Sequence, residues 1–432
     1  MNEKNILLIS VGGNEDVVIH SIVSNKPEKI IFFASVDSRE KISKQIIPAV
    51  FTKLEIIPDY EIVVTDNHQD VGECAFCLLR EIPVRLKKMG LKDLQWPNLI
   101  DYTAGTKSMS SAVVWASSKF PCKLCYIGSQ NKEGRTKDGL GIVKSGAERE
   151  IIFYNPWNKV AFYELSKAGS LFNRGQYKNA VQIIENVEAQ IDTEENKRFF
   201  HILKGIFEGY ACWDNFQHKK ALDDYFKRYM QSFIDIAKIK ENVHPGLIRF
   251  AEQTHVLKEH LEINLNKNEL SWEKIYDLLA NAIRRANLEK KYEDATARLY
   301  SCVEKYSEHA LTVRYGINSS RTRPEQIPDK LREEFIRRYK VIKISEKGTE
   351  EILKFGLQAK FQLLIEFGDE VGKRFKSVQT ELEECLEMRN KSILAHGIIP
   401  INEEKFTRFL HVVMNLFDLK PEDLIYFPVF PE

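Results

Sequence analysis

The chain has 432 residues, of which 43% are hydrophobic and 29% are charged. That length corresponds to about two to four domains of ordinary size, and the composition excludes a disordered, collagen-like or low-complexity protein. With 63 Lys and Arg against 62 Asp and Glu, the net charge of +1 gives no overall attraction to nucleic acid or to an anionic membrane. Any polyanion must therefore be held by a local site.

The N-terminal residues pass directly from a polar start into a short apolar run, without the features of a cleaved leader. No apolar stretch approaches the roughly 18 residues that a membrane span needs. We therefore expect a cytoplasmic protein with no membrane partner.

Two pairs among the seven cysteines have the spacing of metal ligands, Cys74 with Cys77 and Cys122 with Cys125. They fall in a predicted helix and a predicted strand, without the glycine-rich turns that fold thiolates around zinc. We therefore favour buried packing over a metal site. No acidic cluster indicates a catalytic metal either, so no metal cofactor is expected.

The first 155 residues alternate short β-rich runs with amphipathic segments such as 38–51 and 75–89. The runs that predict strands are residues 5–12, 29–35, 60–66, 98–103 and 123–128. This order is typical of a parallel sheet covered by helices on both faces, so residues 1–155 are predicted to form a Rossmann-like α/β domain. Residues 141–154 predict a β-hairpin that closes the domain, with its turn at Ser145 and Gly146.

From residue 156 onward the periodicity is helical, so the second half is predicted to be all α. Residues 171–187 have the Gly-x-Tyr-x-x-Ala spacing of a helical hairpin, without a second copy at a fixed period. Gly, Asn, Ser and Pro concentrate in residues 315–330, which indicates a boundary. We therefore predict a helical region at 156–315 and an α-helical domain at 316–432.

Two loops of the N-terminal domain are candidate binding loops, because ligands of open α/β sheets collect at the carboxyl ends of strands. In the first loop, Gly12 and Gly13 allow close backbone approach and Asn14 can donate to a ligand. A Gly-Gly pair after a strand forms a simple tight turn about as often as it forms a binding loop.

The second loop, "DYTAGTKSMSS", gathers small residues, hydroxyl donors and one lysine where a strand ends and a helix begins. Its members are Asp101, Thr103, Ala104, Gly105, Thr106, Lys107 and Ser108, followed by Ser110 and Ser111. So many donors in so few residues favour an anion-binding loop over a helix start that is merely capped. The chain lacks both GxGxxG in this context and GxxxxGK[ST], which disfavours a nicotinamide enzyme and a P-loop enzyme.

A third candidate is "EMRNKSILAHG", residues 387–397, which predicts a helix that ends at Gly397 with Pro400 beyond it. At about 100° per residue, Arg389 and His396 would then share one helix face, roughly 10 Å apart along the axis. Histidine can exchange protons with an RNA hydroxyl, and arginine can stabilise a charged phosphate, so the pair suits metal-free RNA cleavage. Asn390 is placed to orient the phosphate or His396. From the residues alone, a solvated Arg389 and a capping His396 are equally well supported.

Two of these segments resemble known motifs. "DYTAGTKSMS" resembles the D-x-T-G-G-T-K-x-M motif of CRISPR-associated Rossmann fold (CARF) domains, which bind cyclic oligoadenylates in type III CRISPR immunity. "RNKSILAHG" is similar to the R-x(4-6)-H signature of HEPN ribonucleases. The order of the domains resembles that of the activator-dependent ribonucleases of the same system. Ala104 departs from the usual glycine, and the six-residue spacer is at the long end of the family's range.

The resemblance implies a homodimer in which two HEPN domains pool Arg389, Asn390 and His396, cut single-stranded RNA without a metal and leave a 2′,3′-cyclic phosphate. It implies cyclic oligoadenylate as the allosteric activator, held by the loops described above where two N-terminal domains meet. Whether the domain also degrades the activator, through groups such as Thr106 and Lys107, is not decided by the sequence. Basic residues at 373–378 and Lys391 would lead RNA to the site.

Two alternatives are kept. One is a non-catalytic sensor or transcription regulator, which a basic DNA-reading helix would favour; the sequence shows no such helix, and no DNA partner is expected. The other is a toxin ribonuclease that needs no activator.

Overall fold

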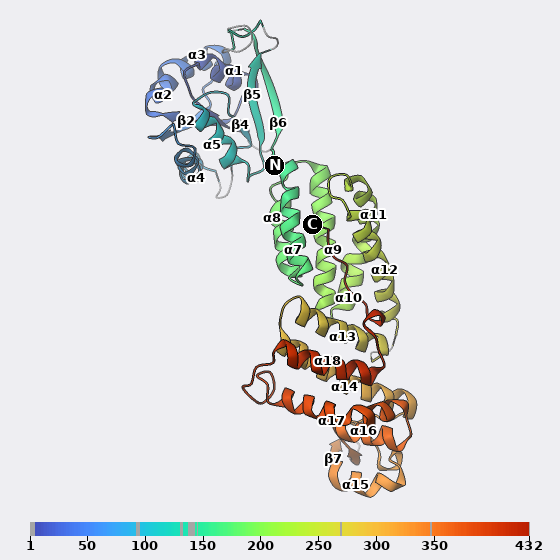
Figure 1. Ribbon diagram of the computed structural model, residues 1–432. Coiled ribbons are helices and arrows are strands. Elements are labelled where there is room, and N and C mark those ends of the chain that lie inside the picture. Colours follow the sequence, from blue (N-terminus) through green and yellow to red (C-terminus); the bar gives the residue numbers. More distant parts are fainter. Residues whose placement is uncertain are drawn as a thin grey trace. The chain divides into compact units, whose positions relative to one another are not determined.

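The computed structural model describes residues 5–91, 96–129, 133–136, 143–144, 146–267, 270–345 and 348–431. Its chain divides into two compact units (Figure 1). Unit 1 comprises residues 1–165 and 182–201, and unit 2 comprises residues 166–181 and 202–432. Each unit has a core of its own and is described separately.

Unit 1 is built on a six-stranded sheet in the order β3-β2-β1-β4-β5-β6. Its strands are β1 (Ile6–Ser10), β2 (Lys29–Ser35), β3 (Asp59–Thr65), β4 (Leu99–Asp101), β5 (Lys123–Ser129) and β6 (Glu148–Tyr154). The first five strands are parallel, and β6 is antiparallel to β5. All five residues of the central β1 are buried, as expected of a continuous apolar run in a sheet covered on both faces. The predicted mixed α/β sheet and its five parallel strands are confirmed.

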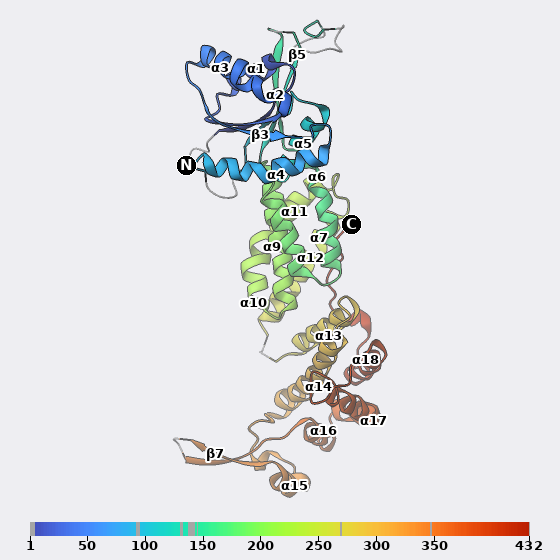
Figure 2. The same ribbon diagram turned by 90° about the vertical axis from the view of Figure 1, so that its left-hand side faces the viewer.

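Helices cover both faces of this sheet (Figure 2). On one face Leu8 and Phe33 pack against α4 (Val71–Lys88) and α5 (Lys107–Ser117). On the other face Leu7 and Phe32 pack against α1 (Glu15–Asn25) and α3 (Ile47–Leu54), and α3 is joined to α2 (Val36–Lys41) by a π-helical stretch, Ile42–Ile46. Because side chains alternate along a strand, neighbouring residues of one strand serve the two opposite cores.

The Ala147 N–H donates to the Lys144 carbonyl at 3.0 Å, at the turn of the hairpin predicted for 141–154, but the predicted pairing of residues 148–154 with the preceding residues is wrong. Residues 148–154 form β6, which pairs along its whole length with β5, from Lys123 opposite Tyr154 to Ser129 opposite Glu148. The edge of β5 offers seven partners in register, more backbone hydrogen bonds than a tight local turn could supply. Residues 141, 142 and 145 of the predicted hairpin lie outside the described residues.

The rest of the chain is predominantly helical. After the short α6 (Trp157–Val160), its helices are α7 (Phe162–Asn173), α8 (Tyr177–Glu188), α9 (Glu194–Asp214), α10 (His218–Lys220), α11 (Lys227–Lys240), α12 (Leu247–Leu265), α13 (Trp272–Asn287), α14 (Tyr292–Tyr315), α15 (Asp329–Tyr339), α16 (Leu357–Glu366), α17 (Glu370–Asn390) and α18 (Glu403–Phe417). A π-helical stretch, Ala221–Phe226, joins α10 to α11. The helical hairpin predicted at 171–187 is present, with Gly175 at φ +75° in its turn and Tyr177 and Ala180 buried.

The helical periodicity predicted that this half is all α, and that prediction is wrong. Residues Lys340–Ser345 (β7) and Gly348–Leu353 (β8) form an antiparallel pair. Leu353 exchanges two backbone hydrogen bonds with Thr322, at 2.7 and 3.2 Å, so the pair is tied to the segment before α15. The β-branched residues of "KVIKIS" favour a strand, a preference that a helical interpretation of the same residues overlooks.

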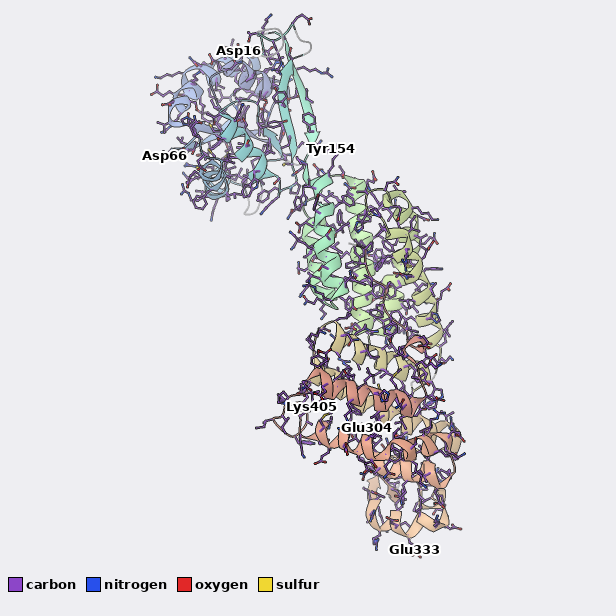
Figure 3. All side chains as sticks on the ribbon, in the orientation of Figure 1. Asp16, Asp66, Tyr154, Glu304, Glu333 and Lys405 are labelled. Atoms are coloured by element: carbon purple, nitrogen blue, oxygen red, sulfur yellow. The ribbon has the colours of Figure 1, made fainter. Side chains whose placement is uncertain are left out.

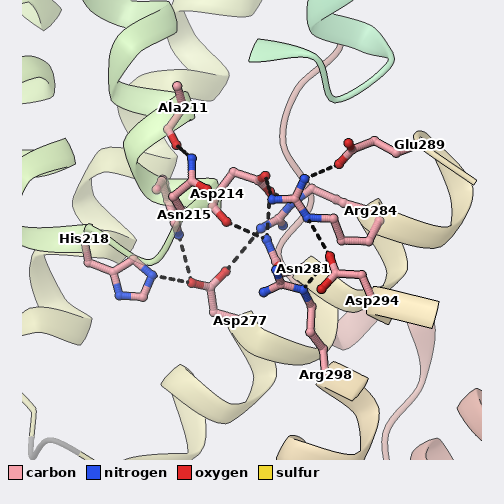
Figure 4. Close-up of polar contacts among 12 residues, drawn as sticks. Ala211, Asp214, Asn215, His218, Asp277, Asn281, Arg284, Glu289, Asp294 and Arg298 are labelled. Atoms are coloured by element: carbon pink, nitrogen blue, oxygen red, sulfur yellow. Dashed lines mark hydrogen bonds and ion pairs between the residues drawn. The ribbon is translucent and has the colours of Figure 1, made fainter. Parts of the chain in front are cut away.

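Buried charges join α9 to α13 inside unit 2 (Figure 4). Asp214 accepts from Asn281 at 2.8 Å, from Arg284 at 3.1 Å and from Arg285 at 2.6 Å. Asp277 binds His218 and Trp213, each at 2.9 Å. Removing one member would leave a buried charge without its counter-ion, so the cluster fixes these two helices to each other.

The segment after α18 returns to the middle helices of the same unit. Phe430 is fully buried, and its backbone exchanges two hydrogen bonds with the side chain of Asn173, at 2.8 and 2.9 Å. A Cβ on Gly169 would lie 2.6 Å from the Phe430 ring, so the helix has glycine where the ring enters. Residues 424–431 therefore connect the last helical domain to α7.

Candidate functional site

The two predicted binding loops of unit 1 touch through their backbones. A Cβ on Gly12 would lie 2.3 Å from the backbone nitrogen of Gly105, and Gly105 itself has φ +92°. No side chain larger than hydrogen fits at the first position, and the second needs the left-handed region that favours glycine. The loop after β1 and the loop after β4 therefore form one surface.

Hydroxyl groups of the second loop hold its neighbours. Thr106 caps α5 by accepting from the Met109 N–H at 3.2 Å, and it donates to the carbonyl of His68 at 2.5 Å. Ser108 donates to the carbonyl of Gln69 at 2.8 Å. These hydroxyls fix the loop after β3 against the start of α5. The sequence analysis predicted instead that they would donate to a ligand.

Asp101 is completely buried and is not a surface ligand of either loop. Its carboxylate accepts from the Thr103 N–H at 2.8 Å, and burial raises its pKa above the usual range. The Thr103 hydroxyl in turn accepts from the Ile127 N–H at 2.8 Å. Ala104 is buried in the core, and its carbonyl accepts from the hydroxyls of Ser10 and Ser110. These residues give the loop its shape.

Two depressions flank the contact between Gly12 and Gly105. One, of about 550 Å³, includes Gly13, Asn14, Thr103, Gly105, Tyr126 and Arg135 in its lining. The other, of about 270 Å³, includes Gly12, Gly13, Asp37, Lys41, His68 and Thr106. Volumes of this order suit parts of a nucleotide ligand.

Asn14 caps α1 through its Oδ1, which accepts from the Asp16 N–H at 3.1 Å. Lys107 is exposed at the first turn of α5 and lies outside the lining of both depressions. Lys41, Tyr126 and Arg135 were missed by the sequence analysis. They come from other elements, and no local pattern marks them.

The C-terminal motif is not a continuous helix. α17 ends at Asn390, seven residues before the predicted end, and Arg389 and His396 therefore do not share a helix face. The chain folds back over the helix end: the His396 N–H donates to the Asn390 carbonyl at 3.2 Å, and the Ile399 N–H donates to the Lys391 carbonyl at 3.1 Å.

Close packing explains the early end of α17. A Cβ on Gly397 would lie 2.0 Å from the carbonyl oxygen of Lys391, so the returning chain lies directly on the helix terminus. Ser392 is buried at the same place, and its carbonyl accepts from the N–H groups of Ala395 and Gly397 at 3.1 Å. These bonds replace the last turns of helix that the sequence predicted.

The motif residues gather at this terminus. The Arg389 guanidinium lies over the Tyr300 ring, 4.3 Å from its centroid, and donates to Asn390 Oδ1 at 3.2 Å. Tyr300 comes from α14 and was missed, because nothing in its local sequence links it to the motif. The imidazole of His396 is exposed. The helix end thus carries the arginine, and the returning loop, bonded to the helix end through its backbone, carries the histidine.

Exposed apolar residues flank the histidine in the sequence of the loop. Ile393 and Leu394 are each 56% exposed, Ile398 is 89% exposed and Ile399 is 47% exposed. Four large aliphatic side chains in one short loop form an apolar surface that water covers at a cost in free energy.

Most basic residues of the predicted RNA path have internal partners. Lys373 pairs with Glu370 and Lys391 with Glu387, each at 2.6 Å. Arg374 donates to the Tyr306 hydroxyl and to the Phe417 carbonyl, each at 3.2 Å. These pairs weaken the case for 373–378 as a path for RNA.

The packing prediction holds for three of the four cysteines with metal-like spacing, since Cys74, Cys122 and Cys125 are buried and Cys77 is half-buried. Burial raises the pKa of Cys122 to about 12, which makes its thiolate inaccessible near neutrality. Within the described residues, no three His, Cys, Asp or Glu side chains gather as metal ligands would. The same described residues contain no helix with the length and apolar character of a membrane span.

Two family models match the helical part of the chain. The Csm6 6H domain matches residues 161–263, and the Csm6 HEPN domain matches residues 266–420. The chain belongs to the type III CRISPR-associated CARF–HEPN proteins of the Csm6 kind. The HEPN match includes Arg389, Asn390 and His396.

A solved structure has a similar fold. Enterococcus italicus Csm6 bound to cyclic hexa-2′-fluoro-hexa-dAMP superposes with a TM-score of 0.55 at 12% identity, over 97% of this chain and 96% of that one. Can2 from Sulfobacillus thermosulfidooxidans in complex with cyclic tetra-adenylate reaches only 0.24 at 8% identity, over 49% of this chain and 68% of that one, too little to carry an argument. A search of curated proteins finds no match.

Proposed function

We propose that this CARF–HEPN protein is an endoribonuclease of type III CRISPR antiviral defence that cyclic oligoadenylate activates and that needs no metal. The observation that carries the proposal is the cluster at the end of α17. There, Arg389 binds the side chain of Asn390, and His396 binds its backbone, inside the segment matched by the HEPN domain.

The cluster has the groups that metal-free RNA cleavage requires. The 2′-oxygen attacks phosphorus, the bond to the 5′-oxygen breaks, and the products are a 2′,3′-cyclic phosphate and a 5′-hydroxyl. His396 exchanges protons with the attacking or the leaving oxygen, and Arg389 stabilises the charge that develops on the phosphate. Asn390 holds the arginine in place through a hydrogen bond of 3.2 Å.

One copy of the loop offers one arginine and one histidine, so the site is proposed to form from two copies. The exposed Ile393, Leu394, Ile398 and Ile399 support this pairing, because a second copy would cover them. Burying an aliphatic side chain fully contributes about 1.5 to 3 kcal/mol. A homodimer with twofold symmetry would place each histidine beside the partner's arginine.

The N-terminal unit is proposed to be a Rossmann-like CARF sensor. Its parallel strands, and the joined loops at their carboxyl ends, support this assignment. We infer that Gly12, Gly13, Asn14 and Gly105, which line the two depressions, contact the ring, whereas the contact of Lys107, which lines neither, stays a prediction. Asp101, Ala104, Thr106 and Ser108 would act by shaping the loops, since their polar atoms bind the protein.

Activator binding would change the equilibrium between inactive and active pairings of the HEPN domains. The domain limits of 1–155, 156–315 and 316–432 stay predictions. So does degradation of the activator by Thr106 and Lys107, which chromatography of the ring after incubation with the protein would test.

The test is cleavage of a fluorogenic RNA in EDTA, with cyclic tetra-adenylate and cyclic hexa-adenylate supplied separately. We expect cleavage with one ring, and a rate about 10²–10⁴-fold lower for His396→Ala, the usual range for a general acid or base. His411→Ala is the matched control, because His411 is an exposed histidine of α18 in the same domain.

Cleavage without either ring would overturn activation and favour the toxin alternative. Binding of a ring without cleavage would favour the non-catalytic sensor. Equal loss in both histidine variants would show that the assay reports on folding and not on the proposed site.

A further inference from the structure

A depression of about 490 Å³ opens beside the catalytic cluster. Its lining combines two aromatic rings with acceptor groups from α16 and α17, among them Tyr300, Tyr339, Gln358, Glu383, Glu387 and Asn390. Asn390 belongs to the cluster itself, and Tyr300 carries the Arg389 guanidinium on its ring. A group bound here would lie next to the phosphate that Arg389 is proposed to hold.

The lining itself favours a neutral occupant over a phosphate. Among the described residues that line the depression none is basic, whereas Glu383 and Glu387 contribute carboxylates. The hydrogen bond and positive charge of Lys391 hold the pKa of Glu387 below its usual range, so that this group is ionised near neutrality. A carboxylate accepts hydrogen bonds and repels an anion, so the site suits a neutral group that donates.

The aromatic residues have different roles. The hydroxyl of Tyr300 donates to Glu304 on the same helix at 2.9 Å (Figure 3 labels Glu304), and burial together with that bond raises the pKa of Tyr300 to about 12. The Arg389 guanidinium lies over the Tyr300 ring, where a planar ligand would otherwise stack. Tyr339 is half-buried, and its ring packs against Phe335 and Phe355 with centroids 5.2 and 6.0 Å apart. Tyr339 is therefore a supported aromatic ring on which a planar ligand can stack.

We propose that this depression binds a nucleobase of the RNA substrate next to the scissile phosphate and prefers a base with an exocyclic amine over uracil. The inference rests on the proposed ribonuclease function, and it adds the part of the substrate that the site reads. Glu383 and Gln358 accept from the amine, Tyr339 stacks on the base, and Asn390 links this pocket to the arginine.

Cytosine and uracil give the sharpest comparison, because they have the same shape and differ along one edge. Cytosine has an amine at position 4 and an acceptor at N3, whereas uracil has a carbonyl oxygen at position 4, which the carboxylate of Glu383 would repel, and an N–H donor at N3. We expect activated protein to cleave an RNA with cytosine at the site about tenfold faster than the same RNA with uracil, measured as kcat/KM. A hydrogen bond to a charged group contributes about 1.5 to 3 kcal/mol, enough for that ratio.

Glu383→Gln should reduce the ratio to about twofold or less. Glu381→Gln should leave it unchanged, because Glu381 is an exposed residue of the same helix that does not line the depression. Tyr339→Leu should raise KM for both RNAs, while Tyr339→Phe should not, because phenylalanine keeps the ring. A ratio near one in the native protein, or an equal change in both glutamate variants, would overturn the proposed pocket.

A binding measurement separates this inference from the proposed function. Fluorescence anisotropy of the two RNAs with the His396→Ala variant requires no catalysis. Tighter binding of the cytosine RNA with no cleavage by native protein would support the pocket and contradict the ribonuclease. Equal binding, with both RNAs cleaved at the same rate by native protein, would overturn the pocket and leave the ribonuclease in place.

Discussion

The N-terminal binding loops and the C-terminal motif loop are held in opposite ways. In the N-terminal loops the polar side chains bind the protein: Asp101 holds Thr103, Thr106 holds His68 and Ser108 holds Gln69. In the C-terminal loop the backbone makes the internal bonds, and the side chains of His396 and four aliphatic residues are exposed to solvent.

This difference separates a formed site from an incomplete one. The N-terminal surface has depressions on both sides of the Gly12 and Gly105 contact, and internal hydrogen bonds hold its loops. The C-terminal loop exposes its histidine together with aliphatic side chains of the same loop, and in the proposed homodimer a second copy would cover them. Substitutions should therefore affect binding at one loop and catalysis at the other.

Among the loop substitutions that leave Arg389, Asn390 and His396 in place, the largest effect is expected at Gly397. In Gly397→Ala the new Cβ would lie 2.0 Å from the Lys391 carbonyl oxygen, so the loop must move and His396 with it. A displacement of about 1 Å can lower a rate roughly 100-fold, and we expect a loss of that size in RNA cleavage at saturating activator. Affinity for the ring, measured by calorimetry, should stay unchanged. A variant with full cleavage activity would show that the loop does not pack on the helix end.

The parallel sheet could be predicted from the sequence because each of its strands is a short apolar run that needs no distant partner to be identified. The end of α17 could not. "NKSILAHG" is compatible with helix, and what stops the helix at Asn390 is the return of Gly397 and Ile399 to Lys391. That contact depends on tertiary packing, which overrides local propensity.

The candidate residues were predicted only where they share a motif. Arg389, Asn390 and His396 lie in one segment, whereas Tyr300, Tyr339 and Gln358 reach the same place from α14, α15 and α16. In the N-terminal loops the residue types were found but several of their roles were not. Serine and threonine hydroxyls can cap a helix as readily as they bind a ligand, and sequence alone does not distinguish the two.

A smaller effect is expected where the two N-terminal loops touch. In Gly12→Ala the Cβ would lie 2.3 Å from the Gly105 nitrogen, so the loops must separate. We expect about tenfold weaker binding of the activating ring by calorimetry, which corresponds to about 1.4 kcal/mol. Gly13→Ala should weaken binding less, because its Cβ would meet nothing within 4 Å. Cleavage by Gly12→Ala at saturating ring should equal that of the native protein, and a lasting loss would contradict the separation of binding from catalysis.

The smallest effect is expected for Asp101→Asn, and its sign follows from the pKa. Burial raises the pKa of Asp101 in the folded chain above its ordinary value of 3.8, so the folded state binds a proton more tightly than the unfolded state. The free energy of unfolding therefore falls as pH rises from about 4 toward the folded pKa. Asparagine is neutral at every pH and keeps an acceptor for the Thr103 N–H, so the variant should lose that pH dependence and be at least as stable at pH 7. Ring affinity should stay within about twofold, because Asp101 shapes the loop without reaching the ligand.

Asp101→Ala removes the acceptor and should lower the free energy of unfolding by about 1 to 3 kcal/mol through the unpaired N–H. Urea unfolding of the three proteins between pH 5 and pH 8 measures both effects. A large loss of ring affinity in Asp101→Asn with stability intact would place the Asp101 carboxylate in contact with the activator and remove the contrast between the two loops.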